Sequence, residues 1–150
     1  MSNFTLASEP QSTFYLSPGI QISWNFCSSI LVGVKISFGK MVEEEYYYNL
    51  TIGRKSLLGK NKLHTDSDYL YCEIQGGSFL GYYPLSAGAG LGATIFTENK
   101  KINVYPKLTL FGGAGIFMTF DYISGKNFTD IGLEAVLPIA FDESYRNLRQ

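Results

Sequence analysis

Hydrophobic and polar residues alternate with a period of two along most of this sequence. The clearest stretch places one apolar set on a single face: Ile30, Val32, Val34, Ile36 and Phe38. Apart from Leu31, the intervening set on the other face is small or polar: Gly33, Lys35, Ser37 and Gly39. Because successive side chains of a strand point to opposite faces, this pattern predicts a β-strand; a helix would need repeats at three and four.

Six further segments alternate in the same way. They lie within residues 20–26, 46–52, 70–74, 85–95, 102–122 and 131–139. Only Cys27, Ser28 and Ser29 separate the first two segments of the chain, which predicts a tight hairpin. The remaining breaks are polar and rich in turn residues, and no linker or longer repeat is present. We therefore expect one domain over residues 1–150, with polar tails at 1–11 and 142–150.

Seven segments are one short of the even number that a closed up-and-down barrel normally needs. Residues 12–16, ahead of a Pro-Gly turn signal at 18–19, offer one candidate for the eighth strand. Division of the long 102–122 stretch at Gly112-Gly113 offers the other. We favour the first, with the glycines marking a bend inside one long strand.

The polar face of the segments favours a membrane barrel over a soluble one. It consists of Gly, Ser, Thr, Asn and Gln, with Lys35, Glu73 and Glu134 as isolated charges. A soluble barrel would carry many charges on its outer face, whereas the lumen of a membrane barrel holds small and polar groups. We therefore predict an all-β, antiparallel up-and-down β-barrel of about eight strands, of the transmembrane type. The residues predicted to face lipid are Ile20, Ile22, Trp24, Val32, Val34, Ile36, Leu133 and Leu137.

On this interpretation Lys35, Glu73 and Glu134 face inward and form a lumenal polar network. Uncompensated charges inside the barrel would be costly, so we expect them to pair with one another. In a narrow eight-stranded barrel such a network would fill and plug the lumen. The alternative is that the three residues line a polar conduit or a binding pocket.

Aromatic residues make up 15% of the chain, and many lie near segment ends. Rings with a polar tip favour the headgroup level of a membrane and form girdles there. The predicted girdle is Tyr46, Tyr48, Tyr82, Tyr83 and Tyr122, with Tyr47, Tyr69, Tyr71 and Phe120 also near segment ends.

Composition narrows the class of protein further. Charged residues are 17% of the chain, below the roughly 25% of soluble domains. The net charge of −1 gives no basic face, so we expect no nucleic-acid partner. The sequence contains no run of about 18 apolar residues, so no transmembrane helix is predicted. Residues 1–11 lack the basic and apolar regions of a signal peptide, so we expect a cytosolic protein or a mature chain behind an initiator Met.

No catalytic or metal-binding constellation is predicted, and we expect no enzyme and no cofactor. His64 is the only histidine, and it lies in a predicted loop beside Asp66 and Asp68, which suits an exposed residue. The acidic run 43–45 suits a rim where divalent cations bridge protein to lipopolysaccharide. Cys27 and Cys72 lack CxxC spacing and serve either as two small hydrophobes or as a disulfide.

The hairpin from Ser17 to Gly39 and the segment Asp130–Ile139 resemble the opening hairpin and last strand of small outer-membrane β-barrel proteins, particularly those of Bacteroidetes-type bacteria. The sequence departs from the common ending of such proteins, because a polar tail follows the last strand instead of a terminal aromatic. The resemblance implies a location in the bacterial outer membrane and carries no catalytic residues across.

Three functional hypotheses follow. The first is a structural or interaction role in the outer membrane, as an accessory subunit of a larger complex, with the lipid bilayer, lipopolysaccharide and another outer-membrane protein as partners. The second is a soluble barrel that binds an apolar ligand, which requires Trp24, Ile36 and Leu133 to face an interior cavity. The third, a lipid-modifying enzyme, would need polar groups converging at a rim.

Overall fold

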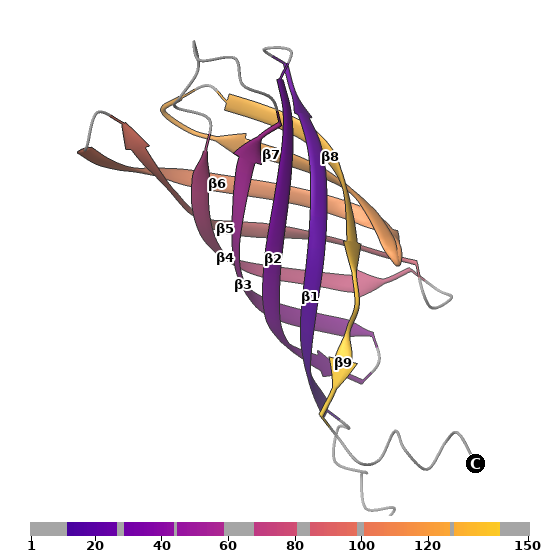
Figure 1. Cartoon of the computed structure of the whole chain (residues 1–150). Coiled ribbons are helices and arrows are strands. Elements are labelled where there is room, and N and C mark those ends of the chain that lie inside the picture. The colour runs from indigo at the N-terminus through magenta and orange to yellow at the C-terminus, as the bar shows by residue number, and fades with distance from the viewer. Residues whose placement is uncertain are drawn as a thin grey trace, which may run out of the picture.

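The computed structural model describes residues 12–26, 29–43, 45–58, 68–80, 85–98, 101–126 and 128–141. These residues form one antiparallel sheet that closes on itself, because β1 pairs with both β2 and β8 (Figure 1). The strands are β1 Ser12–Asn25, β2 Ser29–Val42, β3 Tyr46–Leu57, β4 Tyr69–Phe79, β5 Ser86–Glu98, β6 Lys101–Ala114, β7 Ile116–Ile123, β8 Phe128–Val136 and β9 Ile139–Ala140. Within this part of the chain, no helix has the length and apolar character to cross a membrane.

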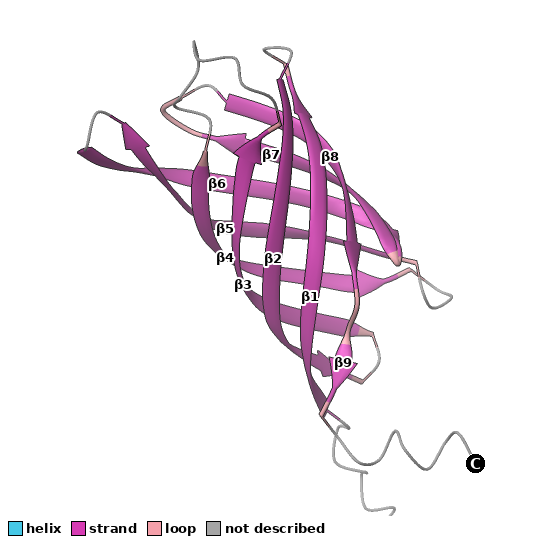
Figure 2. Cartoon of the chain, in the orientation of Figure 1, coloured by secondary structure: helices cyan, strands magenta, loops and turns pink. Residues whose placement is uncertain are grey.

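The barrel has eight strand positions around its circumference, called staves below. β8 and β9 together occupy one of them, because both pair with β1. β8 pairs with Gly19–Asn25 of β1, and β9 pairs with Tyr15 and Leu16 of the same strand. Figure 2 shows turns and loops confined to the two ends, apart from the short break between β8 and β9. The prediction of a closed, antiparallel, eight-stranded barrel is confirmed.

We name the two ends of the barrel by what they carry. The terminal end holds the start of β1, the end of β9 and the connections β2–β3, β4–β5 and β6–β7. The loop end holds the connections β1–β2, β3–β4, β5–β6 and β7–β8. The longest of the connections between strands, from β3 to β4, lies at the loop end.

The preferred origin of the eighth strand was wrong. Residues 12–16 belong to β1, which runs without interruption past Pro18. The 102–122 stretch is instead divided into β6 and β7, and the division falls at Gly115 rather than at Gly112-Gly113. Ala114 pairs with Ile116 across Gly115, which forms a very tight turn. The φ of Gly115 is +76°, a backbone conformation that residues with a side chain rarely adopt.

β1 tolerates Pro18 because its neighbour is also interrupted there. The amide of Leu137, between β8 and β9, donates to the carbonyl of Pro18 at 3.0 Å, and Pro138 follows. The N–H that Pro18 lacks would point to the same neighbouring strand as its carbonyl. Pro18 and Pro138 thus lie at the same gap in the hydrogen bonding between β1 and the β8–β9 junction. On its other side, β1 keeps its register with β2.

The strands are strongly staggered around the barrel. A path that starts at Tyr15 and crosses from partner to partner through all eight staves returns to β1 at Asn25, ten residues further along. Stagger and strand number together set the width of a barrel, and eight strands leave an interior that side chains can fill.

The distribution of hydrophobic and polar residues is inverted relative to a soluble protein. Among the described residues, thirty-two large hydrophobic side chains are exposed and only seven hydrophobic ones are buried. Seventeen polar or charged residues are buried, including three lysines and four carboxylates. Soluble domains bury the first class and expose the second.

Tyrosine rings fill the space above inward-facing glycines. Tyr15 lies over Gly39, its partner on β2, and Tyr71 lies over Gly53, its partner on β3. A Cβ at either glycine would collide with the ring, so the close approach requires glycine there. Packing an aromatic ring on a paired glycine restores the contact area that a strand glycine otherwise lacks.

Candidate functional site

A cluster of buried charges lies inside the lumen, on the side of the loop end. The ammonium of Lys55 lies 2.7 Å from a carboxylate oxygen of Asp121 and 2.8 Å from one of Asp130. The hydroxyl of Tyr69 donates to the other oxygen of Asp130 at 3.1 Å. Asp121 and Asp130 are directly paired across β7 and β8, so Lys55 offsets a repulsion between two facing carboxylates.

A second lysine extends the cluster to β4. Lys107 on β6 lies 2.6 Å from Glu73 and 2.9 Å from Asp121. The hydroxyl oxygen of Thr109 stands within 2.8 Å of each of these carboxylates. The ring of Tyr71 packs against the Lys107 ammonium at 4.6 Å, which adds a cation–π contact.

A smaller ionic cluster lies nearer the terminal end. Lys35 forms an ion pair with Glu134, and Gln21 donates to the other oxygen of Glu134 at 2.7 Å. The hydroxyl of Tyr71 donates to the Gln21 side-chain oxygen at 2.7 Å. Tyr71 therefore contacts both ionic clusters, through its ring in one case and its hydroxyl in the other.

The three residues singled out from the sequence all face the lumen, but they do not form one group. Lys35 pairs with Glu134, whereas Glu73 pairs with Lys107. Four members of the clusters were missed: Lys55, Lys107, Asp121 and Asp130. All four keep the inward parity of their strands. Lys107 and Asp121 lie within the predicted 102–122 segment, and Lys55 and Asp130 are reached when the alternation is extended to the ends of β3 and β8.

Aromatic residues seal the lumen at the loop end. Tyr69, Phe96 and Ile123 are buried together, and Tyr105 and Phe128 pack against them. The ring centroids of Tyr69 and Phe96 are 5.0 Å apart. Lys126 covers this group from the turn after β7, with its ammonium 4.0 Å from the Phe96 ring centroid. These side chains form a packed, mainly aromatic group at the loop end of the described lumen.

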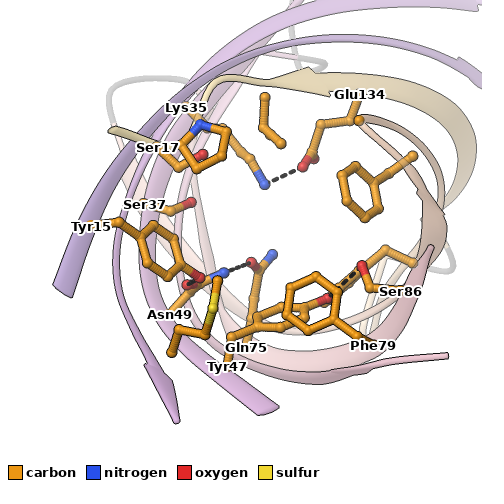
Figure 3. Close-up of a pocket in the computed structure, with 16 residues that line it drawn as sticks. Tyr15, Ser17, Lys35, Ser37, Tyr47, Asn49, Gln75, Phe79, Ser86 and Glu134 are labelled. Carbon is orange, nitrogen blue, oxygen red and sulfur yellow. Dashed lines mark hydrogen bonds and ion pairs between the residues drawn. The ribbon is translucent and has the colours of Figure 1, made fainter. Parts of the chain in front are cut away.

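The terminal end of the lumen is hollow instead. A cavity of about 180 Å³ is bounded by sixteen residues from all eight staves (Figure 3). Met41, Phe79 and Gly115, beside the terminal-end turns, belong to its lining, so its mouth is at that end. Lys35 and Glu134 reach toward each other at its inner side.

The two sides of the cavity differ in chemistry. A hydrogen-bonded chain follows β1, β3 and β4: Tyr15 donates to Asn49 at 2.5 Å, and Asn49 donates to Gln75 at 3.4 Å (Figure 3). The other wall is apolar and consists of Phe111, Phe117, Val136 and Pro138. Tyr47 bridges the two walls, since its hydroxyl donates to Ser86 at 3.3 Å and its ring lies 6.3 Å from Phe111.

The residues predicted to face lipid all lie on the outer surface. Their exposed fractions range from 36% for Val32 to 66% for Ile20. Trp24, Ile36 and Leu133 are among them, so the interior apolar pocket required by the soluble-barrel hypothesis does not use them.

The predicted aromatic girdle is only partly placed on the outer surface. Tyr46 and Tyr48 are exposed at the terminal end of β3, and Tyr122 is half-buried on β7. Tyr82 and Tyr83 lie outside the described residues. Tyr47, Tyr69 and Tyr71, which also stand near segment ends, are buried in the lumen, because each has the opposite parity to its apolar neighbours.

The remaining candidates for chemistry have no supporting geometry. Cys72 is an exposed free thiol on the outer face of β4, and Cys27 lies outside the described residues, as do His64 and Asp66. In the part of the chain that the structure describes, no group of three or more His, Cys, Asp and Glu could hold a metal ion.

Comparison with known proteins gives similarity in fold. No known protein-family profile matches the sequence, and no curated protein sequence matches it. A de novo designed transmembrane β-barrel superposes with a TM-score of 0.51 at 12% identity, covering 83% of this chain and 95% of the design. Neisserial surface protein A (NspA) superposes with a TM-score of 0.51 at 11% identity, covering 85% of this chain and 96% of NspA. This chain thus has the fold of small transmembrane β-barrels over most of its length.

Proposed function

We propose that this protein is a small barrel of the bacterial outer membrane with a structural or interaction role, acting as an accessory subunit of a larger membrane complex. The observation that carries the proposal is the inverted surface. Thirty-two large apolar side chains are exposed among the described residues, and they occur on every stave of the barrel. Monomeric soluble proteins rarely expose contiguous apolar patches of more than a few hundred Å². A lipid bilayer is the partner that covers such a surface on all sides.

The outer surface carries few charges between its two ends. Arg54 on β3 is an exception, and its guanidinium lies 3.5 Å from Asp68 at the loop end of β4. Long basic side chains reach from an apolar zone to its edge in this way. Lys40, near the terminal end of β2, packs its ammonium 5.5 Å from the Phe14 ring. Both positions suit the borders of an apolar band.

The lengths of the connections suggest an orientation. Outer-membrane barrels have short periplasmic turns and longer extracellular loops. The longest connection between strands lies at the loop end, so we place the loop end outside and the terminal end in the periplasm. Glu43 and Glu45 then lie on the periplasmic side, which assigns any contact with lipopolysaccharide to the loop end instead. A Bacteroidetes-type origin stays a prediction.

The closed lumen supports a non-transport role. The aromatic group at the loop end and the two ionic clusters fill the cross-section of the described barrel, so a diffusion pore is not favoured. The buried ionic groups of the described residues converge inside the lumen and not at the outer rim, where a lipid-modifying enzyme would need them. We therefore favour binding to lipid and to another membrane protein over catalysis.

Fractionation of cells that express the full-length protein tests this proposal. We expect the protein to partition with outer membranes and to migrate faster in gels when it is not boiled, since folded barrels resist detergent. A monomer that remains in the aqueous fraction without detergent would overturn the proposal, because the exposed apolar surface could not persist there.

A further inference from the structure

The cavity at the terminal end contains polar groups whose hydrogen-bonding capacity is not used. The ammonium of Lys35 has three N–H donors, and Glu134 is its one partner among the described residues. Its side chain is 4% exposed, so bulk water does not surround it. The hydroxyl of Ser17, on the adjacent strand, lines the same cavity, is buried, and has no partner in the described part of the chain.

An aromatic surface stands beside these polar groups. Phe79, Tyr47, Phe111 and Phe117 form a continuous series in which neighbouring ring centroids are 5.4, 6.3 and 6.3 Å apart. All four rings belong to the cavity lining. A molecule in this space would therefore meet rings on one side and hydrogen-bonding groups on the other.

The electrostatics of the lumen favour a neutral occupant. The charged residues of the cavity lining are Lys35 and Glu134, which pair with each other, so an anion would meet the Glu134 carboxylate there. A cation would meet the Lys35 ammonium at the inner side of the cavity. Burying an unpaired charge of either sign is costly.

The cavity size sets the scale of the occupant. An apolar cavity of about 150 Å³ is large enough to bind benzene. At about 180 Å³, this cavity has the size to hold a single six-membered ring with small substituents.

We propose that the terminal-end cavity binds a small neutral ring compound that carries hydroxyl groups, the chemical class of a monosaccharide. The apolar face of the ring packs on Phe111 and Phe117, and hydroxyl oxygens accept from Lys35 and exchange hydrogen bonds with Ser17. In the orientation proposed above, the mouth faces the periplasm. The binding itself needs only the folded barrel and not the membrane.

The test measures binding of methyl α-D-glucopyranoside to the full-length folded protein by saturation-transfer NMR, with folding verified by circular dichroism. Maltotriose, glucuronate and glucosamine are compared under the same conditions. We expect saturable binding of the neutral glycoside, weaker binding of both charged sugars, and loss of the signal on unfolding. If the glycoside binds and maltotriose does not, the ligand is a free sugar. If maltotriose binds as well, the cavity accepts the end of a glycan.

Two pairs of variants separate binding from general effects on the fold. Ser17→Ala is matched with Ser23→Ala, because Ser23 is an equally buried hydroxyl of the same strand that does not line the cavity. Phe117→Leu is matched with Phe128→Leu, which changes an aromatic residue of the loop-end group. We expect the cavity variants to weaken binding about three- to tenfold, the range of one neutral hydrogen bond or ring contact, and the controls to leave it unchanged.

The proposal is overturned if the folded protein shows no saturable binding of either neutral sugar, if a charged sugar binds more tightly, or if each control weakens binding as much as its partner. None of these results depends on whether the protein fractionates with membranes, so failure of the ligand proposal and failure of the membrane proposal are distinguishable.

Discussion

The loop-end and terminal-end halves of the lumen are built from the same staves, yet one is filled and the other is hollow. Inward positions near the loop end carry Tyr69, Phe96 and Lys55, all almost fully buried. Inward positions near the terminal end include Ser17 and Ser37, which leave space between the walls. The way in which the inward side chains pack across the lumen, rather than strand pairing, therefore separates the packed half from the cavity.

We infer that the packed half mainly stabilises the fold and that the hollow half provides the binding cavity. The packed half contains the ionic cluster of Lys55 and Lys107, in which each ammonium is shared between two carboxylates. Among the described residues, the hollow half contains one ion pair, Lys35–Glu134, which borders the cavity. We expect substitutions in the first half to affect folding strongly and substitutions in the second half to be tolerated.

The largest effect is expected for the central lysine of the packed half. Lys55→Met leaves Asp121 and Asp130 facing each other without their shared cation, and should lower the free energy of unfolding by about 3–5 kcal/mol. Lys35→Met should cost less, since water in the cavity can solvate Glu134. Urea titration in lipid vesicles measures both values. Equal losses would contradict the division of the lumen into two halves.

A smaller contrast is expected between two phenylalanines. Phe96→Ala removes a fully buried ring from the aromatic group and should cost about 3–4 kcal/mol. Phe117→Ala enlarges an existing cavity and should cost less than half as much, because its ring already lacks contacts on one side. The same titration compares the two variants, and a larger loss at Phe117 would show that the terminal end is packed in solution.

The smallest effect is expected at a buried hydroxyl. Ser23 Oγ has no hydrogen-bond partner in the described structure, so Ser23→Ala should leave stability unchanged or raise it slightly. Ser37 Oγ instead lies 2.8 Å from the hydroxyl of Thr51, and Ser37→Ala should cost about 1 kcal/mol. A loss at Ser23 as large as that at Ser37 would indicate an ordered water or another partner at the Ser23 hydroxyl.

The period-two alternation was sufficient to predict the barrel and its inner and outer faces. The same alternation predicts that Tyr47 points inward, because Tyr47 stands between Tyr46 and Tyr48 and has the opposite parity. The grouping of tyrosines into a girdle by closeness to strand ends overlooked this. Parity was the better guide, because it depends only on the geometry of the strand.

Strand boundaries and ion-pair partners were harder to predict. Pro18 resembles a turn signal, and its tolerance inside β1 depends on a break in a strand more than a hundred residues away. The pairing of Lys107 with Glu73 likewise depends on the register of β4, β5 and β6, which alternation alone does not specify. The cavity follows from side-chain volumes summed across all eight staves, so no single segment reveals it.

The central claim, that the apolar outer surface contacts lipid, is tested most directly at Cys72. This native thiol is exposed on the outer face of β4, beside Ile52 and Ala93 in the register. In a Cys27→Ser background, a membrane-impermeant maleimide is applied to outer membranes opened so that both faces are accessible. Cys72→Ala combined with Ser124→Cys serves as the control, since Ser124 is exposed in a loop-end turn.

We expect the Ser124→Cys thiol to react rapidly and Cys72 to react only after the protein is unfolded in denaturant. Rapid labelling of Cys72 in the folded, membrane-associated protein would show that water reaches the outer face of the barrel, and would contradict the membrane-spanning arrangement.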